Sequence, residues 1–221
     1  MPIRLDRRLN AIASLVLGKK VCDVGSDHGK LVCYLVQTGR AESAIATDIS
    51  AQSLRKAERL IADCGLSDLI SVRVGDGLNP VECDEADTVV IAGLGGDVMA
   101  GILQRGRESG KDFEYYILSP NTHAERVRAE ICNTNHTIVY DGRVEQAGKV
   151  YPLIKTMRGG KEKLDGKQLR YGKFFREDEE FKAAAVRELD KLEAMLASNP
   201  EAVNLARRAE ELREALSEVV V

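Results

Sequence analysis

The sequence predicts an α/β fold with a mostly parallel, doubly wound sheet, a terminal antiparallel hairpin and a C-terminal α-helical hairpin of coiled-coil type. In the first 120 residues, short runs rich in Val and Ile alternate with stretches of helical character, as in a parallel sheet covered by helices. Two later apolar runs are separated by a polar segment without a helix-length pattern. From residue 177 onward the chain is charged and contains no glycine.

The N-terminal segment carries apolar residues at helical spacing, namely Leu5, Leu9, Ile12 and Val16. Three arginines beside them, Arg4, Arg7 and Arg8, superficially suggest a signal peptide. No small-residue cleavage site follows, however, and a strand-like run begins a few residues later. We therefore expect an amphipathic helix that covers the domain and keeps these arginines on an exposed face.

Five strand-like runs follow, at residues 20–24, 44–48, 70–74, 87–92 and 115–119. Helical character is clearest at 50–63 and 97–107. Ser50 is suited to cap the first of these helices, which carries Leu54, Ala57 and Ile61 on one face.

The end of the chain changes character twice. Residues 137–140 and 150–157 are strand-like, and we expect the polar segment 141–149 to connect them as an antiparallel pair. Apolar residues then recur at helical spacing on both sides of Pro200, up to Val220. We expect a catalytic domain at 1–158, followed at 159–221 by a basic connector and a helical hairpin.

Composition narrows the class of protein. The five cysteines are an odd number without a C-x-x-C pair, so neither a disulfide framework nor a zinc site is indicated. No apolar run approaches the roughly 18 residues that span a membrane. We expect a cytoplasmic protein with no membrane segment and no metal.

Positive charge is concentrated in one strip, although the whole chain has a net charge of −3. Residues 155–176 contain eight basic and two acidic residues, and the remainder of the chain is acidic. Such a strip suits binding to a phosphate backbone, but a solvated linker explains it equally well. The candidate RNA-binding residues are Lys161, Lys163, Lys167, Arg170 and Lys173.

A glycine-containing loop follows the first strand, at Gly25-Ser26-Asp27-His28-Gly29. In open α/β sheets such a turn lets the backbone approach a nucleotide cofactor. Asp48, which ends the second strand-like run, lies close to the spacing of about 20 residues expected for a carboxylate that holds ribose hydroxyls. NAD and S-adenosylmethionine both fit this geometry, although NAD sites prefer G-x-G-x-x-G.

The acid two positions before Gly25 favours the second cofactor. Asp23 and the two glycines resemble the D-x-G-x-x-x-G loop of class I S-adenosylmethionine-dependent methyltransferases, which implies a Rossmann-like sheet of seven strands and an acid facing the methionine end. Asp76 resembles the residue of these enzymes that reaches the adenine ring. The candidate cofactor-binding residues are Asp23, Gly25, Ser26, His28, Gly29, Asp48, Ile49, Asp76, Gly77 and Gly93.

A second glycine-rich turn, Gly93-Leu94-Gly95-Gly96, ends the fourth strand-like run. Methyltransferases present the acceptor at this place, but the Asn/Asp-Pro-Pro-aromatic tetrad of many amino-directed enzymes is missing here. A tight turn with Asp97 near a helix N-terminus is the alternative interpretation. We expect an acceptor pocket at Leu94, Gly95, Gly96 and Pro120.

The Ser-Asp-His loop, the Gly-x-Gly-Gly turn and the Pro120-Asn121 pair together resemble the bacterial tRNA adenine-22 N1-methyltransferase family over essentially the whole chain. The resemblance implies methyl transfer from S-adenosylmethionine to N1 of an adenine in the D-arm region of tRNA. For this chemistry the first candidate catalytic residue is Asp27, a carboxylate for the developing positive charge at a loop position where a glycine would suffice, and the second is Asn121, an amide partner for the base.

Alternatives remain for both residues and for the function. Asp27 could cap the following helix, and Asn121 could shape the turn after Pro120. The acceptor could be another RNA or a small metabolite, with a hairpin that serves dimerisation. A binding protein that lost catalysis is disfavoured by the intact acids, and the oligomeric state is open. The other histidines, His123 and His136, are expected to be structural or surface residues.

Overall fold

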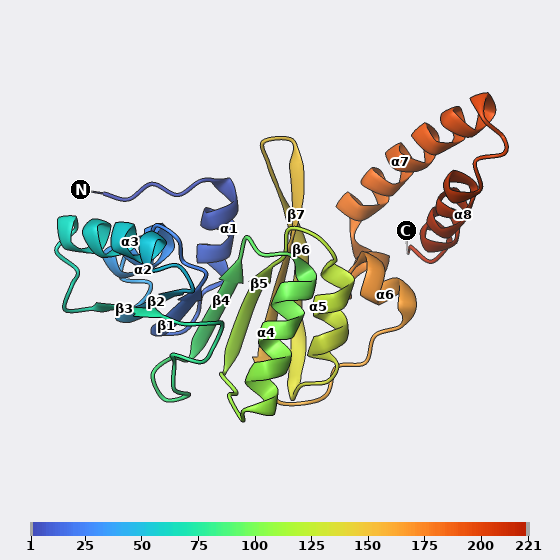
Figure 1. Cartoon of the computed structure of the whole chain (residues 1–221). Helices are drawn as coiled ribbons and strands as arrows, with labels where there is room; N and C mark the ends of the chain where they lie inside the picture. Colours follow the sequence, from blue (N-terminus) through green and yellow to red (C-terminus); the bar gives the residue numbers. More distant parts are fainter. Residues whose placement is uncertain (1, 220–221) are drawn as a thin grey trace. The chain divides into compact units, whose positions relative to one another are not determined.

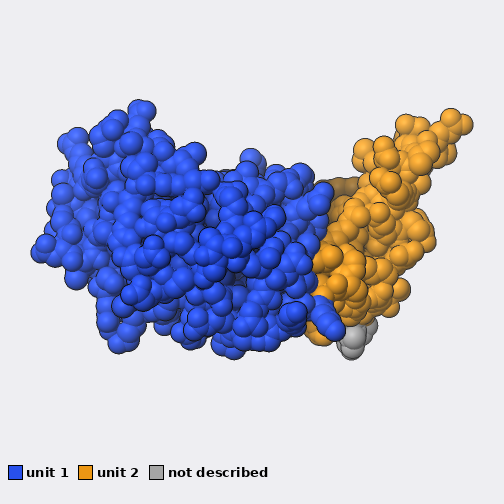
Figure 2. Space-filling model, turned by 60° about the horizontal axis from the view of Figure 1, so that its bottom comes forward, with its two compact units in different colours: residues 1–163 blue, residues 164–221 orange. Residues whose placement is uncertain are grey.

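The computed structural model describes residues 2–219, coloured along the sequence in Figure 1. It divides into two compact units, residues 1–163 and 164–221, which Figure 2 distinguishes by colour. This division lies five residues beyond the expected boundary between 158 and 159. Each unit has an apolar core of its own.

The first unit contains a seven-stranded sheet with the order β3-β2-β1-β4-β5-β7-β6. The strands are β1 (Lys20–Val24), β2 (Ser43–Asp48), β3 (Ile70–Val74), β4 (Thr88–Ala92), β5 (Tyr115–Ser119), β6 (His136–Gln146) and β7 (Lys149–Arg158). The pairs among β1 to β5 are parallel, whereas β7 runs antiparallel to both β5 and β6. The predicted sheet, including its terminal antiparallel hairpin, is confirmed.

Helices cover this sheet, and Figure 1 shows α4 and α5 side by side near β5. The helices of the unit are α1 (Arg7–Leu15), α2 (Lys30–Gln37), α3 (Ala51–Asp63), α4 (Gly96–Glu108) and α5 (Ala124–Ile131). Ser50 caps α3 as predicted, because its Oγ accepts a hydrogen bond from the Ser53 amide at 3.2 Å. The predicted N-terminal helix is α1, which buries Ile12 and Ala13.

The register brings the strand ends that matter to one edge. Val24 at the end of β1 lies opposite Thr47 of β2 and Ile91 of β4. The amides of Gly25 and Ser26 both donate to the Thr47 carbonyl, at 2.8 and 2.9 Å, which ties the first glycine loop to β2. Gly25 has a φ of +76°, a conformation that glycine adopts without strain.

The β6–β7 hairpin is longer than the sequence indicated. The segment 141–149 was expected to be a connection, but residues 141–146 belong to β6 and only residues 147 and 148 form the turn. Polar residues fit in this strand because they pair with β7 while Val144 turns into the core. The expectation was wrong because a polar segment was taken for a loop, whereas these polar residues form a strand by pairing with β7.

The tip of this hairpin stands at the same edge as the glycine loops. Leu118 near the end of β5 pairs with Ile154 of β7, so residues 149–152 continue past the carboxyl end of β5. A buried ion pair supports the hairpin from α5, since Arg128 donates two hydrogen bonds, of 2.8 and 2.9 Å, to the carboxylate of Asp141.

The second unit is helical throughout most of its length. It contains α6 (Gly166–Tyr171), a 3₁₀ turn (Phe175–Glu177), α7 (Glu179–Ser198) and α8 (Val203–Ser217). The predicted helical hairpin is confirmed as α7 and α8, although Val220, expected to end it, lies outside the described residues. The expected connector is partly helical, because Asp165 and Gln168 form a capping box that starts α6.

Among residues 2–219, no helix is long and apolar enough to span a lipid bilayer.

Candidate active site

A cavity of about 640 Å³ lies at the carboxyl edge of β1, β2 and β4. The predicted residues on its wall are Asp23, Gly25, Ser26, Asp27, His28, Asp48, Ile49, Asp76, Gly77, Gly93 and Leu94. Three acids at or just beyond the carboxyl ends of β1, β2 and β3 therefore lie around one space, as expected for open α/β sheets. The sequence did not indicate Asp6, Leu9, Lys30, Val98 and Ile102, which also contribute to the wall.

Asp23 forms a buried, negatively charged part of this wall. Its side chain is only 6% exposed. Burial raises the pKa of this carboxyl to about 6, and the nearby negative charge of Asp48 acts in the same direction. A positively charged ligand group would favour the ionised form, so Asp23 is suited to face a cation.

Asp48 is held by the backbone on both sides. One carboxylate oxygen accepts from the Ser50 amide at 2.8 Å, and the other accepts from the Asp27 amide at 3.3 Å. The remaining lone pairs can accept hydrogen bonds from ribose hydroxyls. Next to it, Ile49 leaves 74% of its surface exposed, and Val98 leaves 56% exposed. Two uncovered apolar side chains on one cavity wall suit a flat aromatic base.

Asp76 is partly engaged by a neighbour that the sequence did not indicate. Arg105 of α4 donates to both of its carboxylate oxygens at 3.1 Å. Ser26 lies next to Asp23, where its buried hydroxyl forms a hydrogen bond that opposes the rise in the pKa of that carboxyl. The wall thus offers a buried acid, a buried hydroxyl and exposed apolar surface, which fit the methionine, ribose and adenine parts of S-adenosylmethionine.

Asp27 has the backbone conformation of a left-handed turn, with a φ of +50°. It does not cap α2, since the cap position belongs to Gly29 and no side chain bonds there. Instead its carboxylate is hydrogen-bonded to Nδ1 of His28, and its side chain stays 59% exposed. Asp27 therefore presents a carboxylate at the cavity.

Several predicted residues are not among those that line the cavity. Gly29 starts α2 in a left-handed conformation, where a Cβ would lie 3.0 Å from that of Ala57. At Gly96 a Cβ would lie 2.1 Å from the carbonyl oxygen of His123. These glycines permit close packing. Gly95, Pro120 and Asn121 also lie outside the cavity wall.

Asn121 lies just beyond the wall and is connected to it through Gly93. Its Nδ2 donates to the Gly93 carbonyl at 2.5 Å, and its Oδ1 accepts from the Arg8 guanidinium at 2.8 Å. The expectation that Arg8 lies on an exposed helix face was wrong, because α1 packs against the ends of β5 and the hairpin. Arg4 and Arg7 are exposed as expected.

Comparison with known proteins identifies this arrangement. Residues 5–154 match the family model described as "Methyltransferase domain". The tRNA (adenine(22)-N(1))-methyltransferase of Bacillus subtilis is 35% identical over 172 residues, which cover 77% of this chain and 72% of that protein. The chain belongs to this family of methyltransferases.

Solved structures agree with the assignment. The crystal structure of the B. subtilis m1A22 tRNA methyltransferase TrmK has a TM-score of 0.82 at 29% identity, and the match covers 97% of this chain and 99% of that one. The Streptococcus pneumoniae protein Sp1610 in complex with S-adenosyl-L-methionine has a TM-score of 0.83 at 30% identity, covering 96% and 100%. The predicted class I methyltransferase fold is confirmed.

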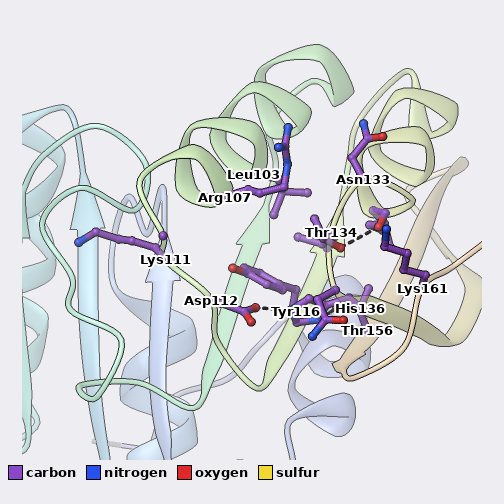
Figure 3. Close-up of a pocket in the computed structure, with 14 residues that line it drawn as sticks. Leu103, Arg107, Lys111, Asp112, Tyr116, Asn133, Thr134, His136, Thr156 and Lys161 are labelled. Carbon is purple, nitrogen blue, oxygen red and sulfur yellow. Dashed lines mark hydrogen bonds and ion pairs between the residues drawn. The ribbon is translucent and has the colours of Figure 1, made fainter.

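The methyltransferase has a second cavity, of about 320 Å³, beside α4, α5 and the start of β5 (Figure 3). At its floor, buried His136 is hydrogen-bonded to Asp112 at 2.7 Å and to Thr156 at 3.0 Å. Burial lowers the pKa of this imidazole. The three residues connect β6, β7 and the segment before β5, so His136 has the structural role expected for it.

The basic strip of the methyltransferase is divided between its two units. In the second unit, Lys167 lies 2.5 Å from the Glu218 carboxylate and Arg170 lies 2.8 Å from that of Glu211. Lys173 lies against the ring of Phe174. In the first unit, Lys161 and Lys163 are exposed and form no ion pair with any described residue. Acids of the C-terminal segment therefore neutralise much of the strip locally.

No group of three or more His, Cys, Asp or Glu side chains within residues 2–219 is arranged to hold a metal ion.

Proposed function

We propose that this methyltransferase transfers a methyl group from S-adenosylmethionine to N1 of an adenine in tRNA, at position 22. The observation that carries the proposal is the match to the B. subtilis tRNA (adenine(22)-N(1))-methyltransferase over 77% of this chain. The cavity supports it independently, since its acids and its exposed apolar side chains suit this cofactor. We further propose that the enzyme acts in the cytoplasm, on the tRNA there.

The cofactor would be held from three strands. When bound, it supplies a methyl group attached to a positively charged sulfur. We assign the methionine end to Asp23, whose ionised form a nearby cation favours. We assign the ribose hydroxyls to Asp48 and the adenine ring to the surface between Ile49 and Val98. Asp76 lines the same cavity.

Methyl transfer to N1 of adenine depends more on alignment of the base with the methyl group than on a general base. N1 of adenine carries an in-plane lone pair, so the new N–C bond can form without prior deprotonation while the S–C electron pair remains on sulfur. Orientation of this kind can contribute about 7–11 kcal/mol to lowering a barrier. Methylation leaves the base positively charged, and we propose that the exposed carboxylate of Asp27 stabilises this charge or accepts a proton from N6.

Contacts with tRNA outside the cavity are assigned to exposed lysines. Lys161 and Lys163 keep unpaired charges that can replace counterions on phosphates. Lys167 and Arg170 contribute less, because their charges already serve ion pairs with Glu218 and Glu211. We retain Lys173 as a weaker candidate because it stays partly accessible.

The test is methyl transfer from labelled S-adenosylmethionine to an unmodified tRNA with adenine at position 22, followed by nucleoside mass spectrometry. We expect 1-methyladenosine as the product. The matched substrate control is the same tRNA with guanine at position 22, which should accept no methyl group. Methylation of both transcripts would contradict the position. Cofactor binding without incorporation into either tRNA would contradict the substrate class and favour another RNA or a metabolite.

A further inference from the structure

We propose that Arg8 is a positioning residue of the acceptor side, which fixes the side-chain amide of Asn121 in one orientation for the target adenine. The inference rests on the proposed function and deepens it, because it assigns a role to the N-terminal helix. Arg8 stands in α1, and Asn121 stands 113 residues further along the chain, directly after β5.

The guanidinium of Arg8 uses all three of its nitrogen atoms at this place. Nη1 donates to Oδ1 of Asn121 at 2.8 Å, and Nε donates to Oγ of Ser119 at 2.9 Å. Nη2 donates to the backbone carbonyl of Ser119. A planar group with donors in a rigid fork restricts its partners more strongly than a lysine would. Arg8 therefore binds both Ser119 and Asn121, the residues on either side of Pro120.

Arg8 is itself held in place by contacts with the β6–β7 hairpin. Its Cζ lies 4.0 Å from the centre of the Tyr151 ring, in the hairpin that extends past β5. The backbone amide of Arg8 donates to Oε1 of Gln146 at 2.7 Å. Burial lowers the pKa of Arg8 from its usual value. Helix α1, the β5 turn and the hairpin tip thus meet at one side chain.

These contacts decide which way the amide of Asn121 points. Arg8 can only donate, and the Gly93 carbonyl can only accept, so Oδ1 must face Arg8 while Nδ2 faces Gly93. The Gly93 carbonyl already disfavours a half-turn of the amide, and Arg8 adds the second contact, which holds Oδ1 on the opposite side and limits rotation of the side chain. Adenine presents a donor, its N6 amino group, beside the reacting N1. An amide oxygen with a free lone pair can accept from that group, whereas the flipped amide would oppose donor to donor.

Arg8 does not itself line the cofactor cavity. A role through Asn121 should therefore change turnover and leave cofactor affinity intact. A purely structural role, in which Arg8 only anchors α1, would lower thermal stability and affect cofactor binding through the neighbouring Asp6 and Leu9 of the wall. The two roles predict different patterns of kcat, KM and dissociation constant.

The experiment compares Arg8→Ala, Asn121→Ala and the double variant, using full-length enzyme, unmodified tRNA and labelled S-adenosylmethionine. We expect each single variant to lower kcat about tenfold or more, with the dissociation constant of the cofactor within about twofold of wild type. In the Asn121→Ala background, Arg8→Ala should lower kcat by less than about twofold, because the two residues act through one contact. Independent, multiplicative losses would overturn the inference.

Two further variants keep the result interpretable. Arg8→Lys keeps the charge but loses the fork, so we expect an intermediate kcat, and it replaces Arg8→Ala in the cycle if that variant does not fold. Arg7→Ala is the matched control, since it removes the same charge from an exposed position of the same helix and should leave kcat unchanged. A wild-type enzyme that methylates no tRNA would overturn the proposed function and this inference together. An active wild type with unaltered kcat in Arg8→Ala would overturn this inference alone.

Discussion

Replacement of Asp23 by Asn should stabilise the cofactor-free protein while weakening the binding of S-adenosylmethionine. The carboxyl is buried, and its pKa lies at about 6 in the folded chain against an ordinary value of 3.8. At about 1.4 kcal/mol for each pKa unit, keeping this group ionised costs the folded state about 3 kcal/mol above pH 6. Asparagine has nearly the same shape and no charge, so the variant removes this cost.

The direction of the pH effect on stability depends on whether the folded or the unfolded chain loses the Asp23 proton at the lower pH. As the pH rises from about 4 to about 6, the unfolded chain ionises Asp23 before the folded chain does, so wild type loses stability over that interval. The free energy of unfolding of Asp23→Asn should therefore exceed that of wild type by about 1.5 kcal/mol at pH 5 and by about 3 kcal/mol at pH 8. These are upper values, because the amide brings a donor of its own into the buried site.

Urea denaturation of both proteins at the two pH values measures this difference directly, since other titrating groups cancel in the comparison. The exposed Asp68→Asn serves as the control and should change stability by less than about 0.5 kcal/mol at either pH. Calorimetry should show cofactor affinity reduced roughly 10- to 100-fold in Asp23→Asn, as expected for losing a charged partner. A variant that is no more stable than wild type at pH 8 would refute the reasoning, as would a stability difference that does not grow with pH.

Three further predictions concern the other parts of the site. Asp48→Ala should weaken cofactor binding, whereas Asp27→Ala should lower turnover at nearly unchanged cofactor affinity; equal losses of affinity in calorimetry would remove Asp27 from the acceptor side. Reversing the charges of Lys161 and Lys163 should weaken tRNA binding and reduce the slope of log K against log salt by about 1–2, and an unchanged slope in filter-binding titrations would exclude them. Gly96→Ala should lower the unfolding midpoint, because its Cβ would lie 2.1 Å from a backbone carbonyl oxygen; a midpoint equal to wild type would show that the turn relaxes freely.

Much of the fold was predictable because its signals are local. Runs of Val and Ile identify buried parallel strands, and Ser50 marks the start of a helix through a bond to an amide three residues away. The cofactor loop was also predictable, since Asp23, Gly25 and Asp48 lie at strand ends that a parallel sheet must bring to one edge. The polar half of the hairpin was not, because its pairing depends on a strand that arrives later in the chain.

The charge pattern of the sequence likewise did not predict which basic residues remain unpaired. Counting along the sequence found a basic strip, but it could not show that Lys167 and Arg170 would meet acids more than 40 residues away. Ion pairs of this kind depend on how α6 and α8 pack within the second unit, and packing is set by apolar contacts such as those of Phe175 and Leu212. Lys161 and Lys163, which form no ion pair with any described residue, kept the charge that the composition indicated.

The sequence by itself determined that this protein has a doubly wound sheet with acids and glycines at the ends of its strands, because period, spacing and backbone freedom are properties of neighbouring residues. The tertiary structure decided what surrounds those strand ends. It buried Asp23 and so raised its pKa, and it placed Arg8 on Asn121 across 113 residues of chain. Burial and long-range hydrogen bonds arise only when segments that are distant in the sequence pack together, so no local sequence pattern could predict them.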